Sequence, residues 1–364
     1  MVPRSKFAKN NTWKVGYKCF MEYENNDSTM ENWENDIYFD ENYGIVNEQL
    51  ELGKSVHYVL NSSNGIIIST FIKRRIPLNG SDDEWYDIRT PYGYGGPLVV
   101  KCYDKEELIS DFEKDFSDFC RRNRIVTEFV RFHPLACNAL DFNGLYSVSL
   151  DRYTVGTDLQ IASNPLEIEF SKKCRKNIRR AFNKGLKYTV IEKPDSIEDF
   201  KNVYYETLDR NNADFFYYFD DEYFTRLIKC FHEKILVIYV YYNDMIISAG
   251  LYFVSCNTVH IHLSGTRNEY LYTNAPYVLR YAAAEWAIQH KIKYLHHGGG
   301  RSNSPDDSLY LFKKQFGLNT EFEFYIGEKI WNKDIYEIVC QEKKPDERVN
   351  DFIRRRFLCG KRLL

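Results

Sequence analysis

Apolar residues recur at strand and helix spacings through most of the first half of this 364-residue chain. Short apolar runs bounded by turn residues indicate strands, and a longer segment with Leu108, Phe112, Phe116 and Phe119 on one side indicates an amphipathic helix. The predicted order is three strands, a helix and a strand, over residues 55–60, 65–76, 98–102, 104–122 and 124–132. This order predicts an α/β unit with a mixed sheet.

The second half alternates helices with longer apolar strands. Residues 144–159 are extended, and Ser171 and Gly185 are placed to cap the two ends of a helix between them. The predicted strands cover residues 187–192, 235–242, 245–255, 258–264, 292–297 and 321–326. The predicted helices cover residues 197–210, 221–231, 276–290 and a segment that starts near Asp306, which Gly317 would cap.

A chain of this length is expected to form two domains. We place them at residues 1–158 and 159–342, followed by a charged tail at 343–364 that we expect on the surface or partly disordered. The predicted class is α/β (α+β), with a mixed, mostly antiparallel sheet flanked by helices in each domain. The two halves share a glycine turn, at residues 93–96 and 298–300, but no clean sequence repeat.

The net charge and the cysteine content limit the binding partners and the cellular compartment that we expect for this protein. The net charge is −3, so any site for a polyanion must be a local patch. Nine cysteines, from Cys19 to Cys359, form no CxxC pair, which favours free thiols in a reducing cytoplasm. No apolar run reaches about 18 residues, and no signal-peptide pattern opens the chain. We therefore expect a cytoplasmic protein without a transmembrane segment.

The most distinctive stretch for chemistry follows the apolar run at residues 292–295. It consists of His296, His297, Gly298, Gly299 and Gly300. A helix comes next and carries Lys313 beside its apolar face. Imidazole titrates near neutral pH, glycine backbone admits a ligand, and lysine attracts a carbonyl or phosphate oxygen. The pattern predicts a substrate site; the alternative is a tight strand-to-helix turn with a half-exposed lysine.

The helix that begins after Ser171 is strongly basic. Its exposed side is predicted to carry Lys172, Lys173, Arg175, Lys176, Arg179, Arg180 and Lys184. So dense a set of cations suits the phosphates of tRNA or of a nucleotide-linked acceptor, with Lys176 and Arg179 as candidate contacts. An ordinary solvated face is the alternative.

The element order of the second half resembles an acyltransferase domain of the GNAT type. Three motifs make the chain similar to the Fem-type branch: Gly298-Gly-Gly300 with Asp307, Phe312-Lys313 and Phe316-Gly317; residues 170–185; and residues 92–97. The resemblance covers most of residues 55–328. It implies two tandem GNAT-like domains, and an enzyme that moves an amino acid from aminoacyl-tRNA to the peptide stem of a peptidoglycan precursor. The chain departs from cell-wall members at His296-His297-Gly298, and also looks like members of unknown or sugar-linked function, such as those that act on surface polysaccharides.

The resemblance also implies a catalytic arrangement. Backbone N–H groups of residues 259–265 would hold the acyl carbonyl, and Lys313 would stabilise the oxyanion or hold a phosphate. His296 or His297 would take the proton of the amine. Since side chains alternate along a strand, one histidine is expected to face the cleft and the other to be structural.

Further residues are implied to bind substrate. Arg267 and Tyr270 follow the predicted strand at 258–264, where the cleft of the family opens, and Tyr94 belongs to the first-domain motif. An ordinary salt bridge is the alternative for Arg267. His260 and His262 would point the same way along one strand, a geometry open to zinc, but no nearby Cys or Glu completes a ligand set, so no metal is expected.

Three functions remain open at this stage. The first is a Fem-like aminoacyltransferase that uses aminoacyl-tRNA, with no tightly bound cofactor and with a nucleotide- or lipid-linked envelope precursor as acceptor. The second is an N-acyltransferase that uses acyl-CoA to modify an amino sugar of a surface polysaccharide. Residues 272–277 lack the glycines that expose pyrophosphate-binding amides in CoA-using relatives, which favours the tRNA donor. The third is a non-catalytic module that binds tRNA or an envelope precursor.

Overall fold

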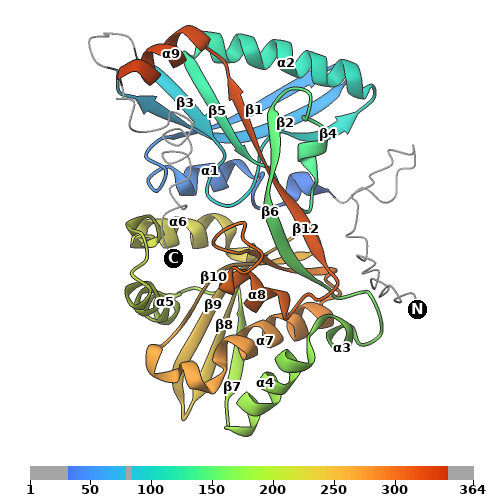
Figure 1. Cartoon of the computed structure of the whole chain (residues 1–364), viewed down its shortest axis with the longest axis vertical. Coiled ribbons are helices and arrows are strands. Elements are labelled where there is room, and N and C mark those ends of the chain that lie inside the picture. The colour runs from blue at the N-terminus through green and yellow to red at the C-terminus, as the bar shows by residue number, and fades with distance from the viewer. Residues whose placement is uncertain (1–31, 79–83, 343–364) are drawn as a thin grey trace, which may run out of the picture.

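The computed structural model describes residues 32–78 and 84–342 (Figure 1). The predicted tail at 343–364 lies outside the described residues. The strands are β1 (Lys54–Ser62), β2 (Gly65–Ile76), β3 (Trp85–Arg89), β4 (Leu98–Cys102), β5 (Ile125–Arg131), β6 (Ser147–Asp158), β7 (Lys187–Glu192), β8 (Ile235–Tyr242), β9 (Met245–Ser255), β10 (Thr258–Thr266), β11 (Tyr294–Gly299) and β12 (Glu321–Ile330).

These strands form one 12-stranded sheet in the order β1-β2-β3-β5-β12-β6-β11-β10-β9-β8-β7, with β4 also paired to β2. Neighbours are antiparallel except for β3 with β5 and β10 with β11, which are parallel. The predicted class, a mixed and mostly antiparallel sheet flanked by helices, is confirmed. The long strands β6 and β12 join the upper and lower parts of the molecule in Figure 1.

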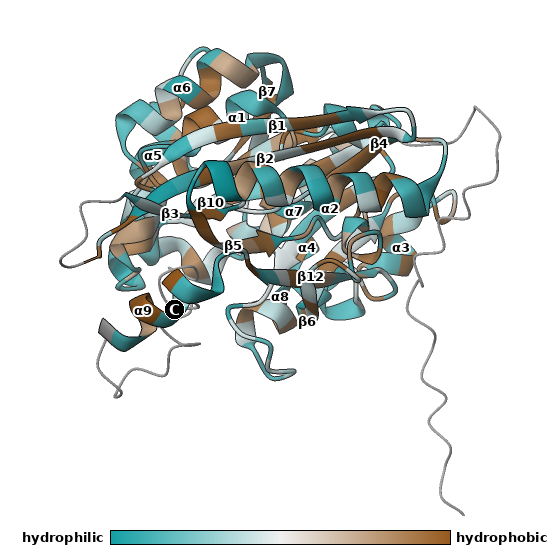
Figure 2. Cartoon of the chain, turned by 90° about the horizontal axis from the view of Figure 1, so that it is seen from above, coloured by the Kyte–Doolittle hydropathy of each residue, from teal (hydrophilic) through white to brown (hydrophobic). Residues whose placement is uncertain are grey.

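The helices that flank this sheet are α1 (Glu41–Asn47), α2 (Lys105–Arg122), α3 (Pro165–Glu169), α4 (Lys172–Asn183), α5 (Glu198–Arg210), α6 (Asp221–Phe231), α7 (Ala275–Gln289), α8 (Ser308–Lys314) and α9 (Lys333–Glu342). In the first half, α2 begins at the cap Asp104, whose side chain accepts the N–H of Glu107. Its hydrophilic and hydrophobic residues alternate along the ribbon (Figure 2), and Leu108, Phe112 and Phe116 are buried against β1, β2 and β5.

Strand β8 explains why the second half has helices on both faces of the sheet. Its residues Ile235, Val237 and Tyr239 pack into one cluster, with α5 and α6. The alternate residues Leu236, Ile238 and Val240 pack into another, with α4 and α7. A strand buried on both faces is read from the sequence as a continuous apolar run, and for that reason its predicted limits match the observed ones.

The segment before β1 packs against the second half of the chain. Ile37, Tyr38 and Tyr43 belong to the same cluster as α5 and α6, and the ring of Tyr43 lies 6.3 Å from that of Phe231. Strand β12, in turn, pairs with both β5 and β6. The division at residues 158 and 159 stays a prediction, since the two halves share one sheet and exchange these segments.

Some predictions about local structure are wrong or incomplete. Strand β3 and helix α9 were not predicted. Gly317 is not the cap of α8, because the helix is followed by Gln315 in a right-handed helical conformation. A Cβ at Gly317 would lie 1.8 Å from the carbonyl oxygen of Gly156, so glycine is required there for close packing of α8 against β6.

Two sequence-based expectations concern the whole chain. Among the described residues, no helix combines the length and apolar character needed to cross a membrane. The cysteines found free are Cys102, Cys120, Cys174, Cys230, Cys256 and Cys340.

Candidate active site

A cavity of about 280 Å³ opens where β10 and β11 separate. The two strands pair in parallel only from Thr258 and Tyr294 to His260 and His296, within the part of the chain that the structure describes. Beyond that point the cavity is lined by Ile261 and His262 of β10, by Gly298 and Gly299 at the end of β11, and by Gly300 after it. Its remaining lining comes from Tyr38, Tyr92, Gly93, Tyr94, Arg131, Asp151, Arg152, Thr154, Phe216, Tyr217, His260, His296, His297, Lys313, Phe324 and Ile326.

The glycines at the end of β11 bring the backbone close to Lys313. The pairing of β11 with β6 shifts register between His296 and Gly298, and Gly298 has a φ of +74°, which favours glycine. A Cβ at Gly298 would lie 3.3 Å from Lys313 Nζ. The lysine ammonium donates a hydrogen bond of 2.7 Å to the carbonyl of Gly299. The predicted association of the glycines with Lys313 is therefore observed.

Helix α8, which carries Lys313, is held by one carboxylate. Asp307 Oδ1 accepts the N–H of Tyr310 at 2.8 Å and caps the helix. Its Oδ2 accepts the N–H groups of Arg301 and Ser302, each at 3.0 Å. The loop after Gly300 and the start of α8 are thus tied to the same side chain, which orients Lys313 toward β11.

The surroundings of Lys313 favour its neutral form more than water does. Burial, together with the charge of Arg280, lowers the pKa of Lys313 to about 7, although Asp307 opposes the shift. A lysine with this pKa gains or loses its proton near neutral pH. An anionic ligand beside it would favour the ammonium form.

His297 is neutral and fixed in one tautomer. Thr157 Oγ1 donates to the carbonyl of Phe316 at 2.7 Å, so it accepts the Nε2–H of His297 at 2.9 Å. Within the described residues, His297 Nδ1 has no hydrogen-bond partner. Burial lowers the pKa of His297 well below the usual value, and the charges of Arg280 and Lys313 act in the same direction.

His296 is also buried, but it points to a different set of partners. Its Nε2 lies 2.9 Å from Thr154 Oγ1, and its Nδ1 lies 3.3 Å from Nδ1 of His260. Burial lowers the pKa of His296 well below the usual value, and His260 and His133 add to the effect. Both predicted histidines line the cavity, but they turn to different partners, His296 to Thr154 and His297 to Thr157. The expectation that one of them faces the cleft and the other is structural stays a prediction.

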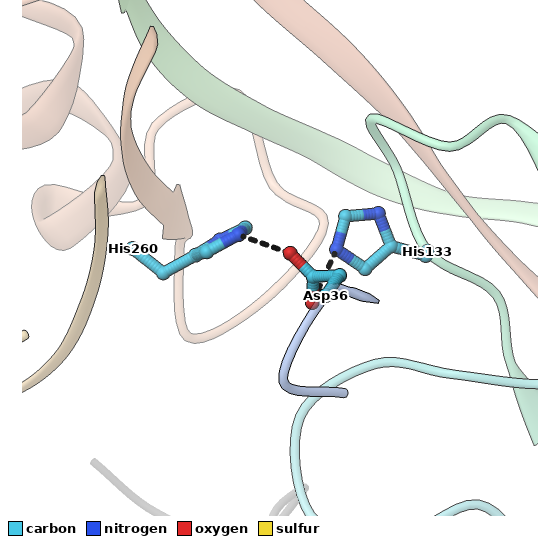
Figure 3. Close-up of side chains that lie close together, drawn as sticks. All are labelled: Asp36, His133 and His260. Carbon is cyan, nitrogen blue, oxygen red and sulfur yellow. Dashed lines mark hydrogen bonds and ion pairs between the residues drawn. The ribbon is translucent and has the colours of Figure 1, made fainter. Parts of the chain in front are cut away.

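A second group of buried polar residues adjoins His296. Figure 3 shows Asp36 between His260 and His133. The carboxylate accepts from His260 Nε2 at 3.2 Å, and His133 Nε2 lies 3.8 Å from its other oxygen. Although burial raises the pKa of Asp36, its interactions with His260, His133 and the N–H of Tyr38 together hold that pKa well below its usual value. His262 turns instead to the hydroxyl of Tyr223, at 2.9 Å.

The spacing of Asp36, His133 and His260 is also that of metal ligands. Their chemistry does not suit a metal, because His133 Nδ1 accepts the N–H of Ala136 at 3.1 Å and therefore carries a lone pair. The proton of neutral His133 must then be on Nε2, the atom that a metal would need. The three groups are better described as a carboxylate with two imidazole donors.

The predicted binding residues are divided between the cavity and the surface. Tyr94 lines the cavity, with its ring 5.5 Å from that of His296. Arg267 instead binds Glu206 at 2.9 Å and the carbonyl of Ile246, the ordinary salt-bridge alternative. Tyr270 donates to the sulfur of Met245. Among the described residues, neither Arg267 nor Tyr270 lines the cavity.

The basic helix α4 does not close over the cavity. Its Lys176 and Arg179 are exposed, and no described residue of α4 lines the cavity. Lys176 and Arg179, the candidate phosphate contacts, therefore lie outside this cavity. The start of α4 does adjoin α8, because the N–H of Ser171 donates to the carbonyl of Gln315.

Several cavity residues were not predicted. Arg131 donates to the carbonyls of Thr90 and Pro91, and Arg152 donates to Asp151 and to the carbonyl of Gly300 at 2.7 Å. Together with Lys313 these arginines give the lining three cations and one carboxylate, which suits an anionic ligand. They come from strands whose sequence carries no recognisable motif, so only their place in the sheet reveals them.

Several known proteins are similar to parts of this chain in sequence. A family model described as an acetyltransferase (GNAT) domain matches residues 170–305. The chain is 25% identical over 170 residues to the UDP-N-acetylmuramoylpentapeptide-lysine N(6)-alanyltransferase of Weissella viridescens, covering 46% of this chain and 49% of that protein. It is 29% identical over 113 residues to the aminoacyltransferase FemA of Staphylococcus aureus (strain bovine RF122 / ET3-1), covering 29% of this chain and 26% of that protein.

Solved structures extend the similarity in fold. The crystal structure of FemX has a TM-score of 0.65 at 14% identity, and it covers 84% of this chain and 94% of its own. The C-terminal domain of a putative lysylphosphatidylglycerol synthetase from Agrobacterium fabrum has a TM-score of 0.55 at 13% identity. The match covers 90% of this chain and 97% of that structure. The sequence matches span half or less of the curated relatives' own length. The predicted relationship to Fem-like acyltransferases of the GNAT type is confirmed.

Proposed function

We propose that this protein is a Fem-like acyltransferase that forms an amide by moving an aminoacyl group from aminoacyl-tRNA to an amine of a cell-envelope precursor. The observation that carries the proposal is the place of Lys313, whose ammonium lies on the carbonyl of Gly299 inside the cavity between β10 and β11. The Weissella relative is named for transfer of alanine to a lysine of UDP-N-acetylmuramoylpentapeptide, which supports an amine acceptor on a peptidoglycan precursor. We place the reaction in the cytoplasm, where charged tRNA is used.

The chemistry assigns distinct tasks to the cavity residues. When an amine attacks the ester carbonyl of the donor, negative charge develops on the carbonyl oxygen. Lys313 in its ammonium form is positioned to stabilise that charge, and Arg131 and Arg152 are positioned to hold an anionic group of the acceptor. The amine must also lose a proton, and the cavity offers the neutral imidazoles of His296 and His297 as acceptors.

The start of α7 favours a tRNA donor over CoA. A nucleotide pyrophosphate binds backbone N–H groups at a helix N-terminus when these are available. Here Ala275 donates its N–H to Thr273 Oγ1, Pro276 has none, and Tyr277 donates to the carbonyl of Asn274. The amides that would hold pyrophosphate are thus occupied or missing.

The donor can be tested directly. The full-length protein is incubated with UDP-N-acetylmuramoylpentapeptide and either a mixture of radiolabelled aminoacyl-tRNAs or radiolabelled acetyl-CoA. We expect transfer from charged tRNA alone. Acetyl transfer to an amino-sugar acceptor instead would support the N-acyltransferase alternative. Transfer from neither donor would favour a non-catalytic module.

We expect the exposed cations of α4 to contribute to tRNA binding. The double substitution Lys176→Glu and Arg179→Glu should weaken tRNA binding about tenfold. The slope of log K against log salt concentration should become less steep by about two, because two phosphate contacts are lost. Binding is measured by fluorescence anisotropy with labelled tRNA over a range of salt concentrations.

A matched control changes the net charge equally elsewhere. Lys114→Glu with Lys229→Glu alters two exposed lysines, on α2 and α6. If both double variants weaken tRNA binding to the same extent, the effect is one of net charge and α4 has no specific role.

The pH dependence of turnover reports how Lys313 acts. With a pKa of about 7, Lys313 is mostly an ammonium below neutral pH and mostly a neutral amine above it. If the ammonium stabilises the oxyanion, kcat/KM should fall as pH rises through about 7. Lys313→Arg should remove this fall, because guanidinium stays charged.

This profile is measured between about pH 5.5 and about pH 9, where arginine does not titrate. A rise in kcat/KM through about pH 7 that disappears in Lys313→Arg would contradict the oxyanion role and indicate that the neutral amine acts as a base.

A further inference from the structure

Four buried side chains from distant parts of the chain form a continuous line that starts at the cavity. Thr154 Oγ1 lies 2.9 Å from His296 Nε2, His296 Nδ1 lies 3.3 Å from His260 Nδ1, and His260 Nε2 lies 3.2 Å from Asp36 Oδ2. The exposed fraction of each residue is 2% or less. Thr154, His260 and His296 line the cavity, whereas Asp36 lies behind them.

The sheet explains this alignment. His260 and His296 are register partners on the parallel strands β10 and β11, so their rings lie side by side. Thr154 belongs to β6, which flanks β11 on its other edge. Asp36 comes from the segment before α1 that packs against the second half of the chain. The line of side chains therefore crosses three neighbouring strands and ends in the segment that covers them.

We assign these hydrogen bonds with one proton on each imidazole, so that both rings are neutral before the reaction. Asp36 also accepts the N–H of Tyr38 and the hydroxyl of Ser255, so it is a carboxylate and His260 must donate its Nε2–H to it. The Nδ1 of neutral His260 is then an acceptor, which requires His296 to donate from its own Nδ1. The Nε2 of His296 in turn accepts the hydroxyl proton of Thr154.

The competing arrangement of Thr154 has poorer geometry. Its hydroxyl lies 3.5 Å from the carbonyl of Phe322, at the outer limit of a hydrogen bond, against 2.9 Å from His296. Donation to Phe322 would also leave two Nδ1 lone pairs facing each other between neutral His296 and His260. Donation to His296 avoids this repulsion, and all three hydrogen bonds then run toward Asp36.

We propose that Thr154, His296, His260 and Asp36 form a proton relay that takes up the proton released by the attacking amine. This inference rests on the proposed amide-forming reaction. In it, the C–N bond forms while the carbonyl π bond becomes an oxyanion beside Lys313, and the nitrogen gives a proton to Thr154 Oγ1. The hydroxyl proton of Thr154 moves to His296 Nε2, and the Nδ1 proton of His296 moves to His260 Nδ1.

The positive charge thereby comes to rest on His260, next to the carboxylate of Asp36. When the intermediate collapses, the C–O bond of the ester breaks, and the reverse transfers return the proton to the leaving oxygen. Protons and charge balance over the two steps, and no further reactant is required.

The relay solves a problem that a single histidine would have. A proton held on His296 would be buried and close to Lys313, a combination that disfavours a second positive charge. On His260 the charge is compensated by Asp36, which also faces the Nε2–H of His133 at 3.8 Å. Two tyrosines also lie beside these rings: Tyr38 is 5.3 Å from His260 and Tyr94 is 5.5 Å from His296, measured between ring centroids. The charge of His297 acts on His296 as well.

The tautomers give a test that does not depend on the substrate. In the full-length protein labelled with ¹⁵N-histidine, long-range ¹H–¹⁵N NMR assigns the protonated ring nitrogen of each histidine. We expect His296 to carry its proton on Nδ1 and His260 to carry its proton on Nε2. A proton on Nε2 of His296 would overturn the relay, because Thr154 could then not donate to it.

Activity provides the second test, in the assay with charged tRNA and UDP-N-acetylmuramoylpentapeptide. Thr154→Val should lower kcat about 100-fold with little change in KM, and Thr154→Ser should restore most of the rate because it retains the hydroxyl. The control Thr258→Val removes another buried hydroxyl of the same sheet, which donates to the carbonyl of Cys256 outside the cavity, and should leave kcat within about twofold.

Equal losses of kcat in Thr154→Val and Thr154→Ser, or an unchanged kcat in Thr154→Val, would overturn the relay. If the unmodified protein transfers nothing from charged tRNA, the proposed function fails, and the NMR tautomers alone decide whether the relay exists.

Discussion

Replacing Lys313 with methionine is expected to lower kcat by about 10²–10³-fold, the usual effect of removing one donor that stabilises an oxyanion. Methionine keeps most of the length of the side chain but has no ammonium to donate to the carbonyl of Gly299 or to a developing negative charge. The KM for the acceptor should change little, because the charge that Lys313 stabilises exists mainly in the transition state. Steady-state and single-turnover rates with charged tRNA measure the effect.

Lys314 offers a control on the same helix. Its ammonium binds Glu321 at 2.8 Å, and it does not line the cavity among the described residues. Lys314→Met should leave kcat within about twofold. Circular dichroism and thermal unfolding of both variants establish that α8 is intact. Full activity of Lys313→Met would reject the role assigned to Lys313.

Replacing Gly317 with alanine is expected to reduce the free energy of unfolding by about 3 kcal/mol, at the upper end of the effect of overpacking. The added Cβ would meet the backbone carbonyl of Gly156 at 1.8 Å, and no side-chain rotation relieves a contact with backbone. Helix α8 would have to move away from β6, which would also displace Lys313. Urea denaturation followed by fluorescence measures the change in stability.

Gly144→Ala is the matched control for this substitution. Gly144 is exposed, and a Cβ there has no atom within 4 Å in the described structure. Its stability should therefore stay within about 0.5 kcal/mol of the unmodified protein. Equal stability of Gly317→Ala and Gly144→Ala would show that α8 packs less closely on β6 than the structure indicates.

The elements that the sequence predicted well are those whose apolar pattern is simple. Strands β8 and β9 are continuous apolar runs with a tight turn between them, and their predicted limits are the observed ones. Strand β3 was missed because it carries Asp87, which looks exposed in a pattern of apolar and polar residues. In the structure Asp87 is buried and paired with Arg74 at 2.8 Å, a partner on the neighbouring strand that no local pattern reveals.

The residues of the candidate site also divide into those that the sequence could predict and those that it could not. The corner formed by His296, His297 and the three glycines, and the nearness of Lys313, could be read from residues close together in the chain. Asp36 could not be associated with His260, because 224 residues separate them. The sequence could not show that α4 lies away from this cavity, because a basic helical face indicates exposure but not which side of the sheet the helix covers.

The sequence alone determined the class of the fold, the limits of the strongly apolar elements and the motif that places a lysine beside a bare backbone. These features depend on local periodicity and on residue types at short spacing. The tertiary structure alone decided which buried charges are compensated, which tautomer His297 takes and which side chains meet where β10 leaves β11. Those outcomes depend on contacts between strands that are distant in the chain. They also depend on burial, because a buried charge or lone pair without a partner costs free energy.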